Sequence, residues 1–87
     1  MGVTFDDEAF AQYIAWQTED KKTVKKINSL IQSIRREGAM GGIGKPERLK
    51  NVATYSRRID EKNRLVYIIA DNGDVKIYSC KGHYKDI

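Results

Sequence analysis

The chain has 87 residues, of which 40% are hydrophobic and 32% charged, with a formal net charge of +4. This length suits one compact domain, so residues 1–87 are treated as a single unit. No stretch reaches the ~18–20 uninterrupted apolar residues that a membrane span needs, and the acidic start does not resemble a signal peptide. We therefore expect a cytoplasmic protein without a membrane partner. The lone Cys80 cannot form an internal disulfide and is expected to be a buried core thiol.

The charges are distributed unevenly along the chain. Residues 1–20 hold five acidic and no basic side chains, whereas residues 21–50 hold nine basic and two acidic ones. This concentration of positive charge is the electrostatic pattern expected for a polyanionic partner such as a nucleic acid. The alternative is an ordinary solvated helix face, because exposed helix faces are commonly charged.

The first part of the chain predicts a short strand followed by a helix. Residues 3–5 favour a strand, and Asp6 is suited to cap a helix that runs to about Thr18. Four residues recur at helical spacing and are expected to face the core: Phe10, Tyr13, Ile14 and Gln17. Trp16 lies at the edge of this stripe, where we expect it to pack against the protein and not to bind a ligand.

The second predicted helix has two distinct sides. Asp20 or Thr18 can cap its start, and Gly38 is suited to end it. Five apolar residues fall within about one third of the helix circumference: Val24, Ile27, Leu30, Ile31 and Ile34. The opposite side carries cations, among them Lys21, Lys22 and Lys25. We expect the apolar side to face the core and the basic side to face solvent.

A glycine-rich loop and three strands follow. Residues 39–46 contain the only proline and lack the spacing of a phosphate-binding P-loop. Strands are predicted for residues 53–59, 64–71 and 75–83, and the pair Asn72-Gly73 is typical of a tight hairpin. The sequence therefore predicts an α+β fold in which two N-terminal helices pack on one face of a twisted antiparallel β-sheet. The other face of that sheet is left for a ligand.

Three residues are candidates for acid–base cleavage of a phosphodiester. This chemistry needs a base, an acid and a cation near the phosphate, and the chain offers Glu47, His83 and Arg64. The plainer interpretations are a surface histidine, a carboxylate paired with a neighbouring cation, and arginines that protect a strand edge. A single histidine and a single cysteine make a zinc site improbable, so we expect neither a metal nor another cofactor.

Six short segments occur in an order that is shared with a known family. They are Y-I-A-W-Q at 13–17, V-K-K-I-N at 24–28, G-K-P-E at 44–47, S-R-R-I at 56–59, R-L-V-Y at 64–67 and C-K-G-H-Y at 80–84. In this order they resemble the YoeB-type toxins of the RelE/ParE superfamily, which cut messenger RNA on the ribosome. The resemblance covers nearly the whole chain and implies a RelE-like, microbial ribonuclease-type fold. The family's loop before S-R-R-I is usually longer and carries an aromatic pair, whereas this chain offers Tyr55 alone.

The resemblance also implies a role for individual residues. Glu47 would be the general base, His83 the general acid, Arg64 the transition-state stabiliser and Tyr84 an orienting group. The residues expected to contact RNA are Lys45, Lys50, Tyr55, Arg57 and Arg58, of which Lys50 and Arg58 match family cations. The residues expected to contact the ribosome are Lys21, Lys22 and Lys25.

The implied activity is that of an mRNA interferase, a ribosome-dependent endoribonuclease that works by metal-independent transesterification in the ribosomal A site and inhibits translation. The implied partners are messenger RNA, ribosomal RNA and a YefM/Phd-like antitoxin with an acidic segment, and a homodimer is a further implied assembly. Two alternatives stay open: a ParE-like inhibitor of DNA gyrase, and a noncatalytic RNA-binding module. Neither alternative would need an acid–base trio, and the RNA-binding module would tolerate loss of Glu47 and His83.

Overall fold

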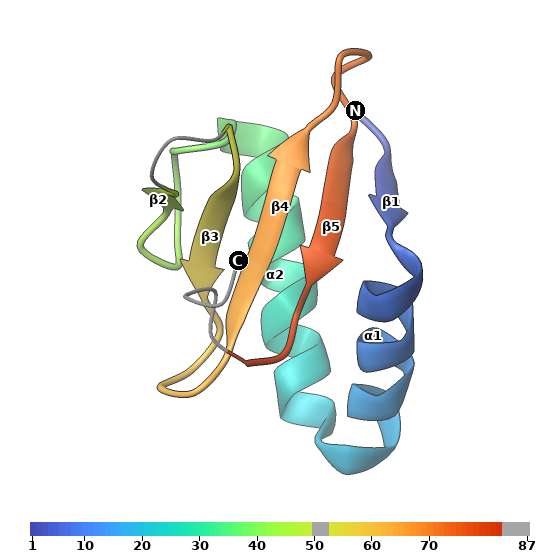
Figure 1. Cartoon of the computed structure of the whole chain (residues 1–87). Coiled ribbons are helices and arrows are strands. Elements are labelled where there is room, and N and C mark those ends of the chain that lie inside the picture. The colour runs from blue at the N-terminus through green and yellow to red at the C-terminus, as the bar shows by residue number, and fades with distance from the viewer. Residues whose placement is uncertain (50–52, 83–87) are drawn as a thin grey trace.

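The computed structural model describes residues 1–49 and 53–82, which form a five-stranded sheet with two helices packed against it (Figure 1). The elements in chain order are β1 (Val3–Phe5), α1 (Asp7–Glu19), α2 (Lys21–Glu37), β2 (Glu47–Arg48), β3 (Tyr55–Arg58), β4 (Arg64–Ile69) and β5 (Val75–Ser79). The strand order across the sheet is β1-β5-β4-β3-β2. The predicted α+β class is confirmed.

The sheet is mixed, which corrects the prediction of a purely antiparallel one. Strands β2 to β5 form an antiparallel meander, but β1 pairs with β5 in parallel, with Val3 opposite Val75. A parallel pair needs a long connection, and here both helices and three strands separate the two partners along the chain. Strand β2 was not predicted, because two residues are too few to display the alternation of a strand.

Helix α2 begins and ends where the sequence predicts. The Asp20 side chain accepts a hydrogen bond from the Lys22 N–H at 3.0 Å, and the Gly38 N–H donates to the Ile34 carbonyl with a glycine φ of 87°. Its predicted apolar residues are buried, except for the half-buried Val24: Ile27, Leu30, Ile31 and Ile34. Its lysines at 21, 22 and 25 are exposed. The predicted two-sided character of this helix is confirmed.

Helix α1 turns a different face toward the core from the one predicted. Phe10 and Ile14 are 51% and 49% exposed, and Gln17 is exposed as well, so only Tyr13 of the predicted stripe packs against the core. Ala9 is fully buried, and Trp16 packs beside it. Apolar residues occur all around this helix, so spacing alone could not select the packed face. Gln12 and Trp16 form hydrogen bonds with Cys80, just beyond β5, and these contacts fix which face is packed.

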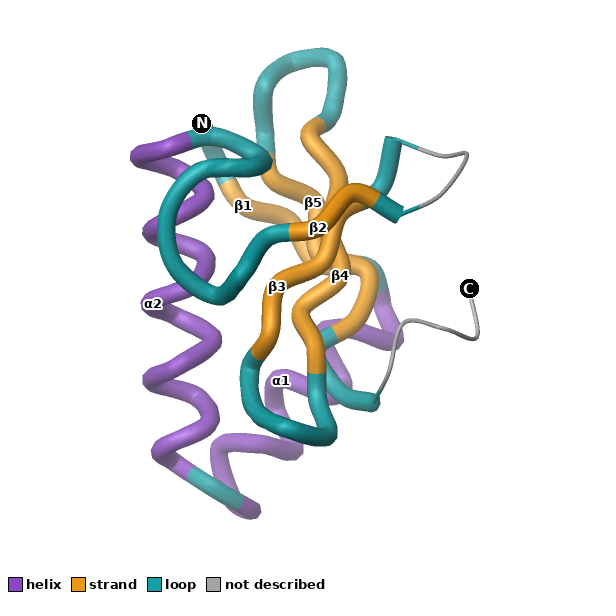
Figure 2. The backbone as a smooth tube through the Cα atoms, turned by 90° about the vertical axis from the view of Figure 1, so that its left-hand side faces the viewer, coloured by secondary structure: helices purple, strands orange, loops and turns teal. Residues whose placement is uncertain are grey.

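The core fills the space between the helices and one face of the sheet. Its buried members include Ile27, Leu30 and Ile34 from α2 and Leu65, Tyr67 and Ile77 from the sheet. Because side chains alternate along a strand, the neighbouring residues of β3 and β4 lie on the opposite face. Figure 2 shows α2 along one side of the sheet. None of the helices in the described ranges is long and apolar enough to cross a membrane.

Candidate active site on the open sheet face

A carboxylate and a guanidinium meet on the sheet face that the helices leave open. Glu47 lies in β2 opposite Ser56 of β3, and Arg64 starts β4 opposite Arg58. Arg64 Nη2 is 3.5 Å from Glu47 Oε2, while Arg64 Nε donates to Ser56 Oγ at 3.1 Å. Three strands thus bring together residues that lie up to 17 positions apart. The predicted Glu47 and Arg64 are neighbours in space.

The Glu47–Arg64 ion pair is partly open to solvent, so it contributes little to folding stability but remains accessible to a substrate. The Glu47 side chain is 52% exposed, whereas that of Arg64 is 11% exposed. An ion pair this open to water contributes at most about 1 kcal/mol to folding. The nearly buried guanidinium is held by the Ser56 hydroxyl and presents a fixed cation beside a carboxylate that solvent can reach. A base and an anion-stabilising group can both act from such a place.

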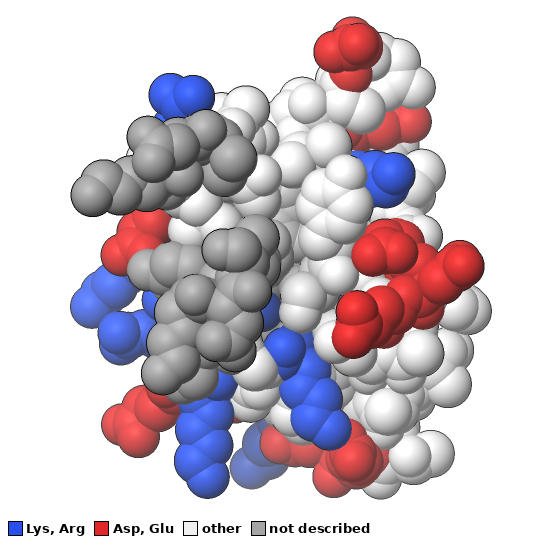
Figure 3. All heavy atoms as spheres, in the orientation of Figure 1, with Lys and Arg blue, Asp and Glu red and all other residues white. Residues whose placement is uncertain are grey.

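Other cations surround the pair on the side of the molecule formed by β2 and β3. Lys45 and Arg58 are exposed, and the Arg58 N–H donates to the Gly44 carbonyl at 2.7 Å. Lys45 has a φ of 51°, a left-handed conformation that persists in a non-glycine residue only where neighbouring structure enforces it. Figure 3 shows basic side chains on this side, with acidic ones among them, and further acidic side chains toward α1.

Arg57 does not lie on this surface, which corrects its prediction as an RNA contact. Its side chain is fully buried, and its guanidinium donates to Ser33 Oγ, Tyr67 Oη and the carbonyls of Gly38 and Ile43 at 2.8–3.0 Å. Two of its acceptors lie at or beyond the C-terminus of α2, where the helix dipole favours a cation. Arg57 is therefore an anchor that fastens the glycine-rich loop to the core.

Tyr67 and Tyr55 complete this anchor. Desolvation by burial raises the pKa of Tyr67, although the hydrogen bond from Arg57 opposes this, so the hydroxyl stays protonated and donates to the Ala39 carbonyl. The Tyr55 ring stacks on that of Tyr67 with centroids 5.7 Å apart and is half buried on the helix-facing side. The structure thus gives Tyr55 a packing role, and its contact with RNA stays a prediction.

Three predicted site residues lie outside the described ranges: Lys50, His83 and Tyr84. The described chain ends one residue before His83, at Gly82, whose carbonyl accepts a hydrogen bond from the Arg64 N–H at 3.0 Å. The roles of these three residues stay predictions. Sequence analysis missed Ser56, although alternation along S-R-R-I puts it on the same face as Arg58.

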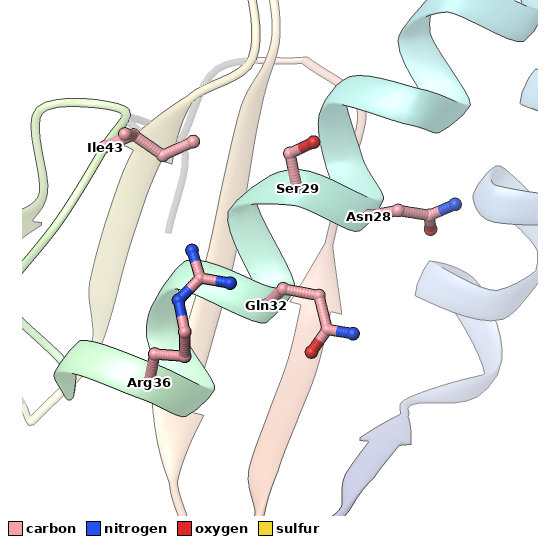
Figure 4. Close-up of a pocket in the computed structure, with 5 residues that line it drawn as sticks. All are labelled: Asn28, Ser29, Gln32, Arg36 and Ile43. Atoms are coloured by element: carbon pink, nitrogen blue, oxygen red, sulfur yellow. The ribbon is translucent and has the colours of Figure 1, made fainter.

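The helix lysines are far from this pair in the fold. Lys21, Lys22 and Lys25 belong to α2, which covers the opposite side of the sheet (Figure 2). A pocket of about 440 Å³ also lies on that side, lined by Asn28, Ser29, Gln32, Arg36 and Ile43 (Figure 4). It shares no residue with the Glu47–Arg64 site. In residues 1–49 and 53–82, no group of three or more His, Cys, Asp or Glu side chains could hold a metal ion.

Comparison with known proteins identifies the family. Residues 5–84 match the model of the YoeB-like toxin of bacterial type II toxin–antitoxin systems. Toxin YoeB of Synechocystis is 47% identical over 98% of this chain and 99% of its own length. A heterotetrameric YoeB–YefM toxin–antitoxin complex from Staphylococcus aureus has a chain that is 53% identical, with a TM-score of 0.88 over 97% of this chain and 98% of that one. A YoeB dimer from the same organism superposes with a TM-score of 0.90, again at 53% identity and over the same shares.

The fold and these similarities define a toxin of a bacterial type II toxin–antitoxin system. Within that class, the chain belongs to the YoeB family, as the sequence motifs had indicated. This membership makes the open sheet face, with Glu47 and Arg64, the first surface to consider for the toxin's activity.

Proposed function

We propose that this toxin is a ribosome-dependent endoribonuclease that cuts messenger RNA in the ribosomal A site. One observation carries the proposal: an accessible Glu47 carboxylate lies 3.5 Å from the Arg64 guanidinium, and the backbone N–H of the same arginine binds the carbonyl of the residue that precedes His83. A carboxylate, a guanidinium and the residue that precedes His83 thus converge. A gyrase inhibitor or a noncatalytic RNA-binding module has no need of that convergence.

In the proposed reaction, Glu47 takes the proton from a ribose 2′-hydroxyl, whose oxygen then attacks the adjacent phosphorus. The bond from phosphorus to the 5′-oxygen breaks, and His83 gives a proton to that oxygen. Arg64 stabilises the negative charge that develops on the phosphoryl oxygens, since its planar fork can bind two of them. The products are a 2′,3′-cyclic phosphate and a 5′-hydroxyl. Tyr84 would orient the reacting groups, and no metal takes part.

The ribosome is part of the proposal because the site is an open face. Positioning of reactants can supply roughly 7–11 kcal/mol of a barrier, and a flexible RNA gains that only from a host that fixes its strand. Lys45, Lys50 and Arg58 would contact the message, and the lysines of α2 at 21, 22 and 25 would contact ribosomal RNA. This activity requires a cytoplasmic location.

The proposed antitoxin is a YefM-like protein, in keeping with the YoeB–YefM complex from S. aureus. An acidic segment of such a partner would cover the cations around Glu47 and Arg64 and so block RNA. A homodimer is the second proposed assembly, in keeping with the YoeB dimer from the same organism.

Primer extension on a translated message tests the activity. Wild-type protein with ribosomes should produce cuts within codons, whereas His83→Ala should reduce the single-turnover rate by about 10²-fold or more. Equal cutting of naked and ribosome-bound message would contradict the ribosome dependence. Equal rates for wild type and His83→Ala would contradict the catalytic scheme.

A further inference from the structure

Residues 80–82, just beyond β5, are held in place by side chains from two distant elements. Residues 80–82 follow the last strand and precede His83. The Gln12 carbonyl oxygen of α1 accepts from the Cys80 N–H at 2.7 Å and from the Ser79 hydroxyl at 3.3 Å. Trp16, also on α1, donates from Nε1 to the Cys80 carbonyl at 2.9 Å. Both backbone polar groups of Cys80 are thus satisfied by α1.

The turn between β3 and β4 holds the next part of the segment. Asn63 Oδ1 accepts from the Gly82 N–H at 2.8 Å, and the Arg64 N–H donates to the Gly82 carbonyl at 3.0 Å. The Asn63 amide nitrogen donates to both carboxylate oxygens of Asp60 at 3.1 Å, which fixes the orientation of the amide and turns its oxygen toward Gly82. The Asn63 side chain therefore accepts the hydrogen bond that a backbone carbonyl of a neighbouring strand would otherwise accept.

The Asp60 carboxylate is itself fixed in this turn. Burial alone would raise the pKa of Asp60, but hydrogen bonds from the Asn63 side chain and from the backbone N–H groups of Lys62 and Asn63 outweigh burial and lower it. Asp60 consequently stays ionised at neutral pH and keeps its hold on Asn63. Four hydrogen bonds to the Asp60 carboxylate thus hold the turn together.

We propose that Gln12 and Asn63 are positioning residues for RNA cleavage, which hold residues 80–82 so that His83 meets the scissile phosphate. This inference rests on the proposed function. The next Cα atom lies about 3.8 Å from that of Gly82, so fixing Gly82 limits where the imidazole can reach. A proton donor must come within about 3.2 Å of its acceptor, and a misplacement of about 1 Å can cost 10²-fold in rate.

The two residues differ from catalytic ones because they touch neither RNA nor the reacting atoms. Beyond Ser79, where β5 ends, β4 still binds the Gly82 carbonyl through the Arg64 N–H, and Gln12 and Asn63 accept hydrogen bonds from the N–H groups of Cys80 and Gly82. A terminal segment without such bonds tends to fray. Loss of Gln12 or Asn63 is therefore expected to slow the chemical step and to leave ribosome binding unchanged.

The chain provides a matched control for Asn63. Asn72 lies in the β4–β5 turn, where its side chain bonds to Asp74 through Nδ2 at 3.2 Å and Oδ1 at 3.0 Å. Asn63→Ala and Asn72→Ala both remove an asparagine from a turn, but only the first releases Gly82. For Gln12, Gln12→Met removes the acceptor at similar size, whereas Gln12→Glu keeps an oxygen that can accept from Cys80 and should restore activity.

The experiment measures single-turnover cleavage of ribosome-bound message in wild-type and His83→Ala backgrounds. Asn63→Ala and Gln12→Met should each slow wild-type cleavage by about 10- to 100-fold, whereas Asn72→Ala and Gln12→Glu should stay within about threefold. In the His83→Ala background, the effects of Asn63→Ala and Gln12→Met should largely vanish, because each acts through the imidazole. Equal slowing in both backgrounds would overturn the proposal.

Amide hydrogen exchange at Gly82 supplies a readout that does not depend on cleavage. Asn63→Ala should accelerate this exchange, and Asn72→Ala should not. Unchanged protection of Gly82 in Asn63→Ala would overturn the proposal even if cleavage fell. If wild-type protein failed to cut, or if His83→Ala cut as fast as wild type, the proposed function would fail, and with it the positioning role of Gln12 and Asn63 in cleavage. In that case, faster exchange at Gly82 in Asn63→Ala would still show that Asn63 holds Gly82 in place, so the two failures can be told apart.

Discussion

Two adjacent arginines in β3 show how strongly a residue's role depends on the face it occupies. Arg57 is fully buried and binds carbonyls of the glycine-rich loop, whereas Arg58 is exposed on the side of Glu47 and Arg64. Strand alternation separates their side chains by the thickness of the sheet. One arginine consequently organises the loop that leads to Glu47, and the other lies on the face where we propose that RNA binds.

Replacing each arginine by methionine should separate these roles. Arg57→Met would leave the buried Ser33 hydroxyl and the part-buried carbonyls of Gly38 and Ile43 without this donor, and should lower the free energy of unfolding by about 2–4 kcal/mol. Arg58→Met should change it by no more than about 0.5 kcal/mol while weakening binding to ribosome-bound message. Urea unfolding and binding assays on both variants check this. Similar stabilities for the two variants would contradict the anchor role of Arg57.

Cys80 is expected to be unreactive in the folded protein. Burial raises the pKa of its thiol from 9.0 to about 11, which reduces the thiolate that reacts with alkylating agents. At pH 8, iodoacetamide should modify the native protein at least about 10²-fold more slowly than the unfolded protein.

The pKa of the Cys80 thiol is higher in the folded protein than in the unfolded one. The thiol therefore contributes stability that is present below pH 9 and lost as pH rises through about 11. A Cys80→Ala variant should show a smaller loss of stability over that range.

At the scale of elements, the glycine-rich loop is fitted against the core at Gly44. Its φ is 89°, and a Cβ atom there would lie 2.5 Å from Leu30 Cδ2 in the core. Gly73, in the β4–β5 turn, has nearly the same φ of 91° but no atom within 4 Å of such a Cβ. Both glycines therefore adopt a left-handed backbone conformation, but only Gly44 lies against core atoms.

Alanine substitution should therefore affect the two positions unequally. Gly73→Ala should lower the free energy of unfolding by about 1 kcal/mol, because only the left-handed conformation is penalised. Gly44→Ala should lower it by about 2–4 kcal/mol, because the methyl group also displaces Leu30. Urea midpoints give both values. A loss at Gly44 no larger than at Gly73 would mean that the loop can move away from the core.

Features that depend on contacts within one element could be predicted from the sequence, whereas features that depend on contacts between distant segments could not. Helix α2 was predicted well because its own residues divide into an apolar and a basic side. Helix α1 was not, because the contacts of Gln12 and Trp16 with Cys80 join segments 64–68 positions apart. The burial of Arg57 was missed for the same reason, since alternation along β3 separates it from Arg58 without telling which of them the helices cover.

For the whole molecule, the charges define two separate basic surfaces. The cations near Glu47 and Arg64 lie on the side of the molecule formed by β2 and β3, whereas the exposed lysines belong to α2, which covers the other face of the sheet (Figure 2). The first turn of α1 carries two acidic residues, Asp7 and Glu8. If the open face binds the message, the opposite face is available for another polyanion, and the ribosome offers one in its ribosomal RNA.

Neutralising the helix lysines tests whether the two basic surfaces bind different partners. The combined substitution of Lys21, Lys22 and Lys25 by Gln removes three exposed cations from α2 without touching the sheet. Each phosphate contact that is lost lowers the slope of log affinity against log salt by about 0.7–0.9, so ribosome affinity should fall and become less sensitive to salt. The cleavage rate at saturating toxin should stay near that of wild type. Glu47→Gln should give the opposite result, with unchanged affinity and a rate lowered by about 10²-fold. Unchanged affinity and salt dependence in the triple variant would make the basic side of α2 an ordinary solvated surface.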